Sequence, residues 1–420
     1  MLGLHPRRAG QARSGVRAGL RTRFPGSFTV RSRGGWMMAD TQRCETGAAL
    51  NEALGSIGRM DLLVVRLPFL EPFGTSVAAW SVKEAVLLRL EQDGIVGWGE
   101  CVADPDPYYD GETTASARYL ITDYLLPELD PAKSLLQVMG QFRRVRGNPM
   151  AKATVENALL DLLARRRGIP LHELLGFRSR PIPSGLSIGI QDSLAALLAK
   201  VEEGVAQGYH RVKVKIMRGK DVEWIGAVRE RFPGLSLMAD ANGDYSLADA
   251  DHLRRLDAFG LTMIEQPLGY HDIYQHSLLQ PRLQTRLCLD ESIHSLEDAA
   301  AALDLGACRV INIKQGRVGG LLESIRIARF CESRGVPVWS GGMDETGIGR
   351  AVNIQLQAAE NFCIPGDTSE TRRYFLEDIA DPPVVLGEDG FIAMPEGPGT
   401  GVTVDPDRLN RYTIHRERLR

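Results

Sequence analysis

Three acidic residues in the second half of the chain each follow directly after a short apolar run typical of a buried strand. They are Asp240, Glu265 and Asp290, and equal intervals separate them in the sequence. If the runs are neighbouring parallel strands of a barrel, their carboxyl ends meet on one face and bring the carboxylates together. Carboxylates at close range repel one another, and a hard divalent cation removes that cost. Because all the ligands are oxygen atoms, the pattern predicts Mg²⁺, with Mn²⁺ as a substitute.

Lysines occupy two other strand-like runs. In Arg211 to Ile216, Lys213 and Lys215 are two residues apart, so both side chains lie on one face of the strand. Lys314 directly follows the run Arg309 to Ile313. This run would be the sixth strand and would lie across an eight-stranded barrel from the second. A lysine beside another cation and a metal ion loses its proton more easily and can act as a base near neutral pH. The arrangement predicts removal of a proton from the carbon next to a carboxylate, with a metal ion stabilising the enediolate.

Each of these patterns also has a simpler interpretation. The three acids could instead cap the helices or turns that follow their strands. Lys213 and Lys215 could face solvent from an edge strand, although the apolar alternation would then point the wrong way. The segment Gly185-Leu-Ser-Ile-Gly189 matches a serine hydrolase motif, but it lies inside a strand-like run rather than at a strand-to-helix turn. Its serine, Ser187, is therefore kept only as a candidate substrate-binding residue.

The elements that would position these residues alternate along the chain from about residue 182. Strand-like runs are expected at residues 185–190, 211–216, 235–239, 261–264, 286–289, 309–313 and 336–339, with a weaker one near 362–364. Helical patterns are expected at residues 194–207, 221–231, 247–259, 296–305 and 321–334. Alternating strands and helices imply a parallel sheet, and seven or eight such units can close into a barrel. An open, doubly wound sheet is the competing architecture.

The rest of the chain divides around this barrel, which is assigned to residues 182–366. Residues 1–59 are rich in arginine and, up to Ala39, lack acidic residues, which favours a disordered extension over a transit peptide. Residues 60–178 combine strand-like runs, a hairpin signal at Asp93-Gly94 and helical patterns at residues 112–126 and 151–167, as expected for an α+β cap. Residues 367–420 no longer alternate, and we expect them to pack back on the cap.

Composition is that of an ordinary globular protein and excludes several classes of partner. The chain has 420 residues, of which 44% are hydrophobic and 25% charged, and its formal net charge is −3. It therefore lacks the basic field that attracts nucleic acid or anionic lipid, and no apolar run is long enough to cross a bilayer. The 6 cysteines form no C-x-x-C pair and fit no zinc site, which favours reduced thiols in the cytoplasm. We expect a cytoplasmic enzyme with no nucleic-acid or membrane partner.

Taken together, these motifs resemble the enolase superfamily and, within its muconate-lactonizing group, the o-succinylbenzoate synthase / N-succinylamino acid racemase family. The resemblance covers about residues 60–405. It rests on Lys213-Val-Lys215, Asp240-Ala-Asn242, Ile264-Glu-Gln-Pro267, Leu289-Asp-Glu-Ser292, Asn312-Ile-Lys-Gln-Gly-Arg-Val-Gly-Gly320 and Gly341-Gly-Met-Asp-Glu-Thr-Gly-Ile-Gly-Arg350. It implies a modified TIM-type (β/α)7β barrel, an α+β capping domain formed by the N-terminal module and the C-terminal tail, and a homo-oligomer. The mandelate racemase group is not favoured, because it requires a histidine base after the seventh strand.

The resemblance implies a role for each candidate residue. The ligands of Mg²⁺ would be Asp240, Glu265 and Asp290. The acid–base pair would be Lys215 and Lys314, with Lys213 assisting Lys215. The residues around them or in contact with the substrate would be Asn242, Glu291, Arg317, Glu345 and Ser187. The loop Phe73-Gly-Thr-Ser76 would close over a small-molecule carboxylate substrate.

The resemblance also implies an activity. It points to an o-succinylbenzoate synthase of menaquinone biosynthesis, with N-succinylamino acid racemisation as a second activity, and a dedicated N-acylamino acid racemase is the alternative. Dipeptide epimerase, muconate cycloisomerase and a non-catalytic barrel are less favoured. One departure concerns substrate choice, because Asp344 stands where the family usually has an apolar residue, often leucine. We expect a charge beside the pocket to alter which substrate is accepted.

Overall fold

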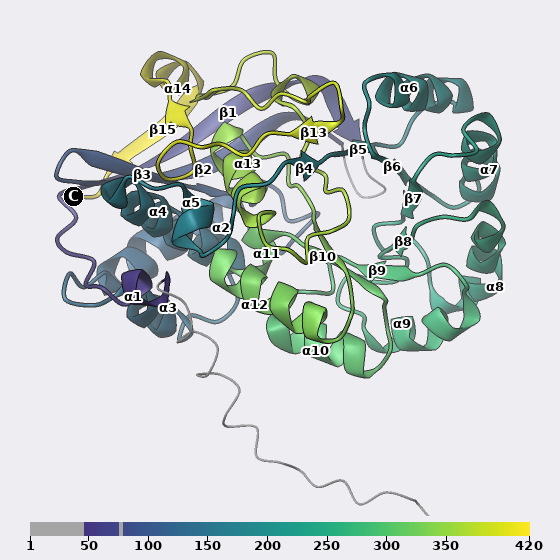
Figure 1. Ribbon diagram of the computed structural model, residues 1–420, viewed down its shortest axis with the longest axis horizontal. Coiled ribbons are helices and arrows are strands. Elements are labelled where there is room, and N and C mark those ends of the chain that lie inside the picture. Colours follow the sequence, from purple (N-terminus) through teal and green to yellow (C-terminus); the bar gives the residue numbers. More distant parts are fainter. Residues whose placement is uncertain (1–45, 75–78) are drawn as a thin grey trace, which may run out of the picture. The chain divides into compact units, whose positions relative to one another are not determined.

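The computed structural model describes residues 46–74 and 79–420. Most of the expected extension, Cys44, and the residues Thr75 and Ser76 of the expected substrate loop lie outside the described residues. The described chain forms an antiparallel cap and a parallel (β/α) barrel, which confirms the expected fold class (Figure 1). Among the described residues, no helix is both long enough and apolar enough to cross a membrane.

The cap is built on an antiparallel sheet. In the described part of the chain its strand order is β15-β1-β2-β3, with bounds Thr413–Arg418, Arg59–Gly74, Ala79–Gln92 and Ile95–Cys101. Asp93 and Gly94 join β2 to β3 with φ angles of 52° and 80°, the left-handed pair that a tight hairpin requires. Strand β15 pairs antiparallel with β1, so the last residues of the chain complete a sheet that begins near residue 59.

Both faces of the cap sheet are covered. The cap helices are α2 (Thr114–Leu120), α3 (Leu135–Phe142), α4 (Pro149–Arg167) and α5 (Leu171–Leu174), with short π and 3-10 turns at Ile121–Leu125 and Leu126–Glu128. Helix α4 approaches β3 so closely that a Cβ on Gly99 would stand 2.0 Å from the carbonyl oxygen of Thr154, so only glycine fits there. On the other face, Leu63 and Leu87 pack against Phe375 and other residues that follow the barrel.

The cap begins earlier than expected. Residues 46–58, which the composition assigns to a disordered extension, contain helix α1 (Thr46–Leu50) and bury Leu50, Leu54 and Ile57. These side chains belong to the same apolar cluster as the cap helices. The predicted disorder is therefore wrong for this stretch, because its few apolar residues have a core to cover, which composition alone does not reveal.

The barrel strands lie side by side in the order of the sequence. Among the described residues the parallel sheet comprises β5 (Gly185–Ile188), β6 (Arg211–Lys215), β7 (Leu237–Asp240), β8 (Ile264–Glu265), β9 (Leu287–Leu289), β10 (Val310–Ile313) and β11 (Val338–Ser340). Each strand overlaps one of the expected runs. Remaining short strands are β4 (Ile182–Pro183), β12 (Ala380–Asp381), β13 (Phe391–Ile392) and β14 (Thr403–Val404).

The weaker run near residue 362 closes the barrel. Phe362 forms a parallel bridge with Val338 of β11, and Gly366 forms one with Ser184, next to β5. The segment is too irregular to count as a strand, yet it connects the last strand of the sheet to the first. The competing open sheet is therefore excluded.

Helices surround the barrel sheet (Figure 1). Those at or near expected positions are α6 (Leu194–Ala206), α7 (Asp221–Arg231), α8 (Ala250–Leu253) with its flanking 3-10 turns Leu247–Asp249 and Arg254–Phe259, α10 (Leu296–Asp304) and α12 (Leu321–Ser333). The sequence patterns miss α9 (Tyr274–Leu279), α11 (Gln315–Val318), α13 (Gly347–Leu356) and α14 (Pro406–Tyr412), and 3-10 turns at Gln280–Arg282 and Thr371–Arg373. All residues of α13 are buried, and its first turn contains Gly347 and Gly349, which disfavour a helix and so weaken the helical signal in the sequence.

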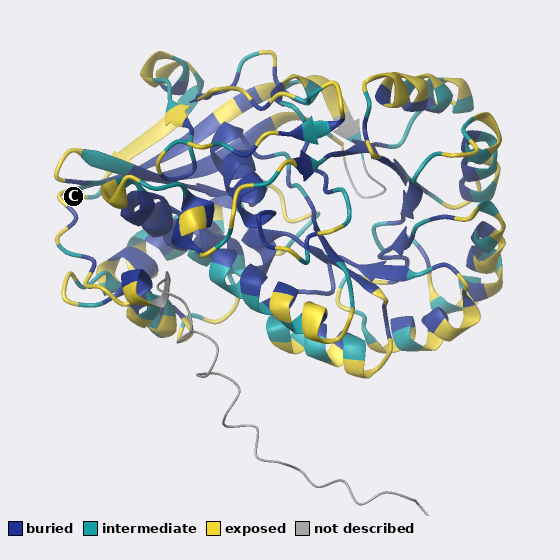
Figure 2. Ribbon diagram, in the orientation of Figure 1, coloured by how far each residue is buried: buried dark blue, intermediate teal, exposed yellow. Residues whose placement is uncertain are grey.

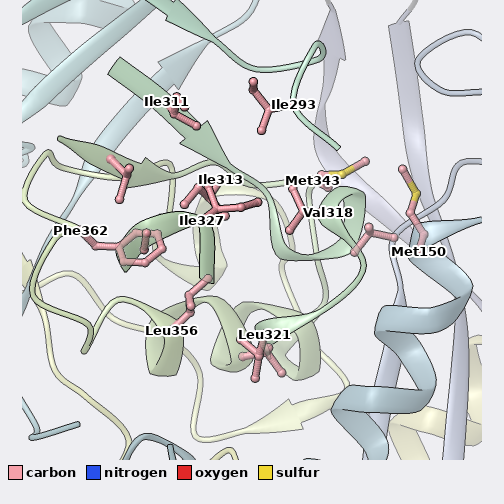
Figure 3. Close-up of a cluster of buried hydrophobic side chains, with 14 of the residues drawn as sticks. Met150, Ile293, Ile311, Ile313, Val318, Leu321, Ile327, Met343, Leu356 and Phe362 are labelled. Atoms are coloured by element: carbon pink, nitrogen blue, oxygen red, sulfur yellow. The ribbon is translucent and has the colours of Figure 1, made fainter. Parts of the chain in front are cut away.

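The cap and the barrel share one apolar core. Figure 2 shows the strands of both sheets as largely buried and the outer helical faces as exposed. In Figure 3, Met150 of cap helix α4 belongs to the same cluster as Val318 and Leu321 of the barrel, and this cluster extends to Ile313 of β10. This shared core fixes cap residues and strand ends relative to one another.

Candidate active site

The three acids predicted as metal ligands lie at the carboxyl ends of adjacent strands. Asp240 is the last residue of β7, Glu265 is the last residue of β8, and Asp290 directly follows β9. The register of the sheet aligns Lys215 with Asp240, and Asp240 with Glu265. Each acid is at most 1% exposed. Strand geometry therefore brings the three carboxylates to one end of the barrel.

Lys215 lies at the centre of a chain of polar contacts. Its Nζ donates a hydrogen bond of 2.6 Å to Asp240 Oδ2 and one of 2.7 Å to Asn242 Oδ1. Asn242, which has a left-handed φ of 43°, donates through Nδ2 to Glu291 Oε1 at 2.9 Å. Asn242 and Glu291 therefore hold the lysine in place from the loops that follow β7 and β9.

Lys213 is buried more deeply in the same strand. Its Nζ lies 3.1 Å from Glu265, 3.2 Å from Asp240 and 2.6 Å from Asp367. Ser187 of β5 is aligned with Lys213 across the sheet, and its side chain lines the cavity. Three carboxylates thus surround one ammonium group next to Lys215.

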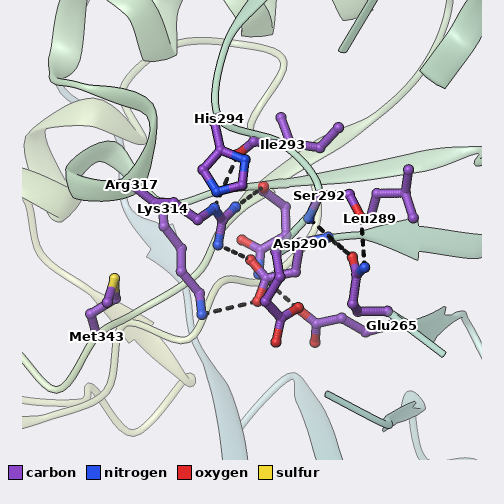
Figure 4. A network of polar contacts seen from close by, with 12 residues as sticks. Glu265, Leu289, Asp290, Ser292, Ile293, His294, Lys314, Arg317 and Met343 are labelled. Atoms are coloured by element: carbon purple, nitrogen blue, oxygen red, sulfur yellow. Dashed lines mark hydrogen bonds and ion pairs between the residues drawn. The ribbon is translucent and has the colours of Figure 1, made fainter. Parts of the chain in front are cut away.

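Lys314, which follows β10, points together with Arg317 toward Asp290 (Figure 4). Its Nζ lies 3.0 Å from Asp290 Oδ2, and Arg317 contacts the other oxygen of the same carboxylate. Arg317 is fully buried and also donates to the carbonyl oxygens of Ile293 and Asn312 at 3.0 and 3.1 Å. The arginine therefore fixes Asp290 and the segment that carries Lys314.

Glu345 does not face the substrate cavity. Its Oε1 accepts hydrogen bonds from the backbone N–H of Met343 at 3.0 Å and from Asn353 Nδ2 at 2.8 Å. It therefore shapes the loop after β11. Glycine at the start of this loop leaves room for the site, because a Cβ on Gly341 would stand 2.5 Å from Oδ1 of Asn312 and 2.8 Å from Cε of Lys314.

Burial and neighbouring charges determine how the acids titrate. Burial raises the pKa of Glu265 well above its usual value, and the neighbouring carboxylates add to the shift. Burial likewise raises the pKa of Glu291 to about 7. For Asp290, burial acts in the same direction, but Arg317 and Lys314 outweigh it and lower the pKa to about 2. The cations therefore keep Asp290 ionised, whereas burial favours the protonated forms of Glu265 and Glu291.

The carboxylates in turn keep Lys213 and Lys314 protonated. Burial acts to lower the pKa of Lys314, but Asp290 and the neighbouring acidic groups together outweigh it, and the pKa lies well above the usual value. The same balance, through Asp367 and Glu265, raises the pKa of Lys213. A base requires the opposite shift. A divalent cation that shared these carboxylates would compete with the ammonium groups and lower their pKa values.

The ligand chemistry of the site fits a hard divalent cation. Among the described residues, no three histidine, cysteine, aspartate or glutamate side chains have metal-binding geometry, and cationic side chains lie on the three acids instead. Within the same residues, Asp290 Oδ2 and Glu291 Oε2 are buried without a hydrogen bond, although Lys314 Nζ lies near the former. Buried carboxylate oxygens without a hydrogen bond are costly, and a cation bound to them would offset that cost. Oxygen ligands alone suit Mg²⁺.

Tyr109 is a site residue that the sequence patterns miss. It lies between β3 and α2 in the cap, and its hydroxyl accepts hydrogen bonds from Lys314 Nζ at 2.7 Å and from Arg317 Nη1 at 3.3 Å. Its ring also lies beside the ammonium group, with Nζ 4.7 Å from the ring centre. The cap therefore contributes directly to the surroundings of Lys314, through a loop with no local motif.

Asp367 and Lys83 are also missed. Asp367 follows the segment that closes the barrel and pairs with Lys213 and, at 2.7 Å, with Arg211. It obeys the same strand-end rule as the other acids, so treating the weak eighth run as a strand would have identified it. Lys83 of β2 donates to the carbonyl oxygens of Val102 and Met343 at 3.2 and 2.9 Å and thereby joins the cap to the loop after β11.

These residues surround a small cavity of about 70 Å³, lined by Phe69, Trp80, Val82, Lys83, Asp104, Tyr109, Ser187, Lys213, Lys215, Asn242, Lys314, Gly342, Met343, Asp344, Asp367 and Tyr374. A larger hollow of about 650 Å³ lies between the cap sheet and α14 and contains none of the candidate residues. We assign the candidate active site to the smaller cavity, because Lys213, Lys215 and Lys314, which lie on the three acids, all line it.

Comparison with known proteins agrees with this geometry. The family model for the mandelate racemase / muconate lactonizing enzyme N-terminal domain matches residues 59–176, and the enolase C-terminal domain-like model matches residues 196–408. An o-succinylbenzoate synthase of Geobacillus stearothermophilus is 49% identical over 81% of this chain and 92% of its own. An N-succinylamino acid racemase of an Amycolatopsis species is 43% identical over 84% and 96%. A crystal structure of an enolase superfamily member from Listeria innocua has a TM-score of 0.83 at 41% identity and covers 87% of this chain and 99% of that one.

Proposed function

The chain belongs to the enolase superfamily, in its mandelate racemase / muconate lactonizing family, and on that premise we propose that it is an o-succinylbenzoate synthase. The substrate would be a succinyl-hydroxycyclohexadiene carboxylate. Removal of the proton next to the carboxylate and loss of hydroxide would give o-succinylbenzoate for menaquinone biosynthesis. We place the reaction in the cytoplasm, and we propose that the enzyme is a homo-oligomer.

One observation carries the proposal, namely that two lysines enter one cavity from opposite sides of the barrel. Lys215 belongs to β6 and Lys314 follows β10, with β7, β8 and β9 between them in the sheet. Both line the same cavity, and each lies within 3.0 Å of an acid at a strand end. A carbon held between them would meet an amine or ammonium group on each face.

The acids would bind the metal ion, and the lysines would transfer the proton. Asp240, Glu265 and Asp290 would hold Mg²⁺, which supplies positive charge beside the substrate carboxylate and so makes the adjacent proton more acidic. Lys215 would take that proton on Nζ, oriented by its hydrogen bond to Asn242 Oδ1.

Two further groups support this step. Lys213, which lies on Asp240 as Lys215 does, would assist Lys215. Lys314, held between Asp290 and Tyr109, would remain protonated and stabilise negative charge that develops in the ring.

Racemisation of N-succinylamino acids is the second candidate activity. Lys314 is directed into the cavity opposite Lys215, so the two could exchange the roles of base and acid on the two faces of one carbon. Arg317, fixed on Asp290, would keep Lys314 in position for this exchange.

The test is a pair of kcat/KM measurements on the purified full chain with Mg²⁺. One follows formation of o-succinylbenzoate, and the other follows racemisation of an N-succinylamino acid. Efficient dehydration supports the proposal. Racemisation alone would favour the second candidate, and failure of both reactions together with no exchange of the α-proton into deuterated water would rule out both.

The metal is tested without an activity assay. A ligand that binds only the folded state stabilises it by about 2.7 kcal/mol at one hundred times its Kd. We expect Mg²⁺ to raise the Tm of the EDTA-treated protein and Asp290→Asn to remove this response. An equal response in wild type and variant would contradict the assignment of Asp290 as a ligand. Light scattering on the same samples tests the homo-oligomer.

A further inference from the structure

The loop after β11 carries two adjacent acids with different surroundings. Glu345 is buried and its carboxylate is satisfied by Met343 and Asn353 within the protein. Asp344 is only partly buried, lines the cavity and, among the described residues, has no hydrogen-bond or ion-pair partner. The carboxylate of Asp344 is therefore free to contact whatever occupies the cavity.

The backbone favours this presentation. Asp344 has a φ of 54°, a left-handed conformation that aspartate and asparagine tolerate better than other residues with a side chain. Met343, the preceding residue, lines the same cavity as Lys314, and Figure 4 shows the two side chains next to each other. The loop thus places the carboxylate of Asp344 on the wall of the reaction site.

The lysines that line the cavity are engaged elsewhere. Lys83 is 3% exposed, donates to the carbonyl oxygens of Val102 and Met343, and lies 3.5 Å from Asp104. The remaining lysines lie on the acids at the strand ends and on Asp367, as described above. Of the three acids that line the cavity, Asp104 and Asp367 are paired with lysines, and Asp344 is not.

An unpaired carboxylate on the wall of a small cavity selects its ligand by charge. A substrate arm that ends in a carboxylate is repelled, an apolar arm leaves the acid desolvated without a partner, and a cationic arm gains a charge-assisted hydrogen bond. We propose that Asp344 selects N-succinylamino acids whose side chain ends in a cationic group, such as a guanidinium. The inference rests on the racemisation that the proposed function includes and names its preferred substrate class.

The test compares two substrates that differ only in charge. N-succinyl-L-arginine has a guanidinium group, and N-succinyl-L-citrulline has a neutral urea of nearly the same shape. For the wild-type enzyme with Mg²⁺, we expect kcat/KM for racemisation to be about ten- to a hundredfold higher for the arginine derivative. A ratio near one would overturn the proposal.

Two variants of Asp344 complete the test. Asp344→Asn keeps the left-handed backbone and removes the charge, so the ratio should fall to about one. Asp344→Glu keeps the charge and should retain part of the preference. If Asp344 had a purely structural role, Asp344→Asn would lower the rates for both derivatives equally and leave their ratio unchanged, which would overturn the proposal. The ratio is measured within each preparation, so it remains informative even if one variant is unstable.

The proposed function fails in a different way. If wild-type protein neither forms o-succinylbenzoate nor exchanges the α-proton of any substrate, the assignment of the site itself is wrong. If it racemises both derivatives equally, the site stands and only the role of Asp344 is refuted.

Discussion

Two layers of side chains inside the barrel come from the same strands but differ in chemistry. The lower layer is an apolar cluster of Met238, Met263, Cys288, Val310 and Trp339. The upper layer lies two residues further along four of these strands and consists of Asp240, Glu265, Asp290 and Asn312. In each strand, alternation directs both residues to the barrel interior. The backbone therefore supplies equivalent positions, and residue type alone makes one layer a core and the next a reactive site.

The boundary between the layers shows how the protein tolerates charge next to an apolar core. The ring of Trp339 lies below two cations, with Arg211 Cζ 4.9 Å and Lys213 Nζ 5.0 Å from its centre. Both cations also bind Asp367. An aromatic face attracts cations, so the indole ring packs against the charged groups without leaving them unpaired. The apolar layer thus stabilises the fold. This stability offsets the cost of burying the charged groups of the upper layer.

The largest effect should come from removing the proposed base, Lys215, which pairs with Asp240 of the upper layer. We expect Lys215→Gln to lower kcat for dehydration by about a thousandfold or more, because a positioned acid or base contributes roughly 10² to 10⁴. The matched control is Lys200→Gln, which changes a lysine that pairs with Glu71 on the surface. Steady-state rates, with circular dichroism to confirm folding, give the comparison. A Lys215→Gln enzyme within tenfold of wild type would mean that another group takes the proton.

Paired substitutions in the two layers should separate stability from metal binding. Asp290→Asn leaves Arg317 and Lys314 without their carboxylate, and breaking such a buried pair costs about 3–5 kcal/mol. Met263→Ala in the lower layer should cost about 2–5 kcal/mol through the cavity that it creates.

Urea unfolding with and without Mg²⁺ distinguishes the two. Met263→Ala should keep the stabilisation by Mg²⁺ and Asp290→Asn should lose it. If both variants kept it, the upper layer would not be the metal site and the contrast between the layers would be one of packing only.

The layers also explain what could be predicted from the sequence. Asp240, Glu265, Asp290 and the lysines are fixed by strand period and by the rule that parallel strands end on one face, so local pattern suffices. Tyr109 and Lys83 reach the site from the cap, and no local signal encodes a contact between residues 109 and 314. Helix α13 escapes prediction because Gly347 and Gly349 in its first turn disfavour a helix, and Asp367 because the segment before it is too irregular to read as a strand.

Glu156 shows how a buried carboxylate behaves without a cation beside it. It accepts the backbone N–H of Leu322 at 3.0 Å where α4 meets α12, and burial raises its pKa to about 8 from an ordinary value of 4.5. Asp290, buried to the same degree but paired with two cations, has a lowered pKa. The folded state therefore holds the proton of Glu156 more tightly than the unfolded state does.

The resulting pH dependence has a defined sign. The contribution of Glu156 to stability is greatest below about pH 4.5, declines as pH rises to about 8, and is constant above that. Relative to wild type, Glu156→Gln should therefore gain roughly 2–4 kcal/mol of unfolding free energy across this window. Urea unfolding of both proteins at pH 5, 6.5 and 8 measures the difference. Parallel curves would show that Glu156 is ionised in the folded protein at every pH.

The smallest effect concerns a residue that belongs to neither layer. Tyr109→Phe removes the hydroxyl that accepts from Lys314 and keeps the ring beside it, so the loss of one hydrogen bond to a charged group should lower kcat/KM about tenfold. Tyr108→Phe is the matched control, because its side chain is 63% exposed. If the two variants have equal activity, the strand-end residues position Lys314 without help from the cap. If kcat/KM falls only in Tyr109→Phe, the upper layer and Lys314 depend on a contact from the cap, and the barrel strands alone do not complete the site.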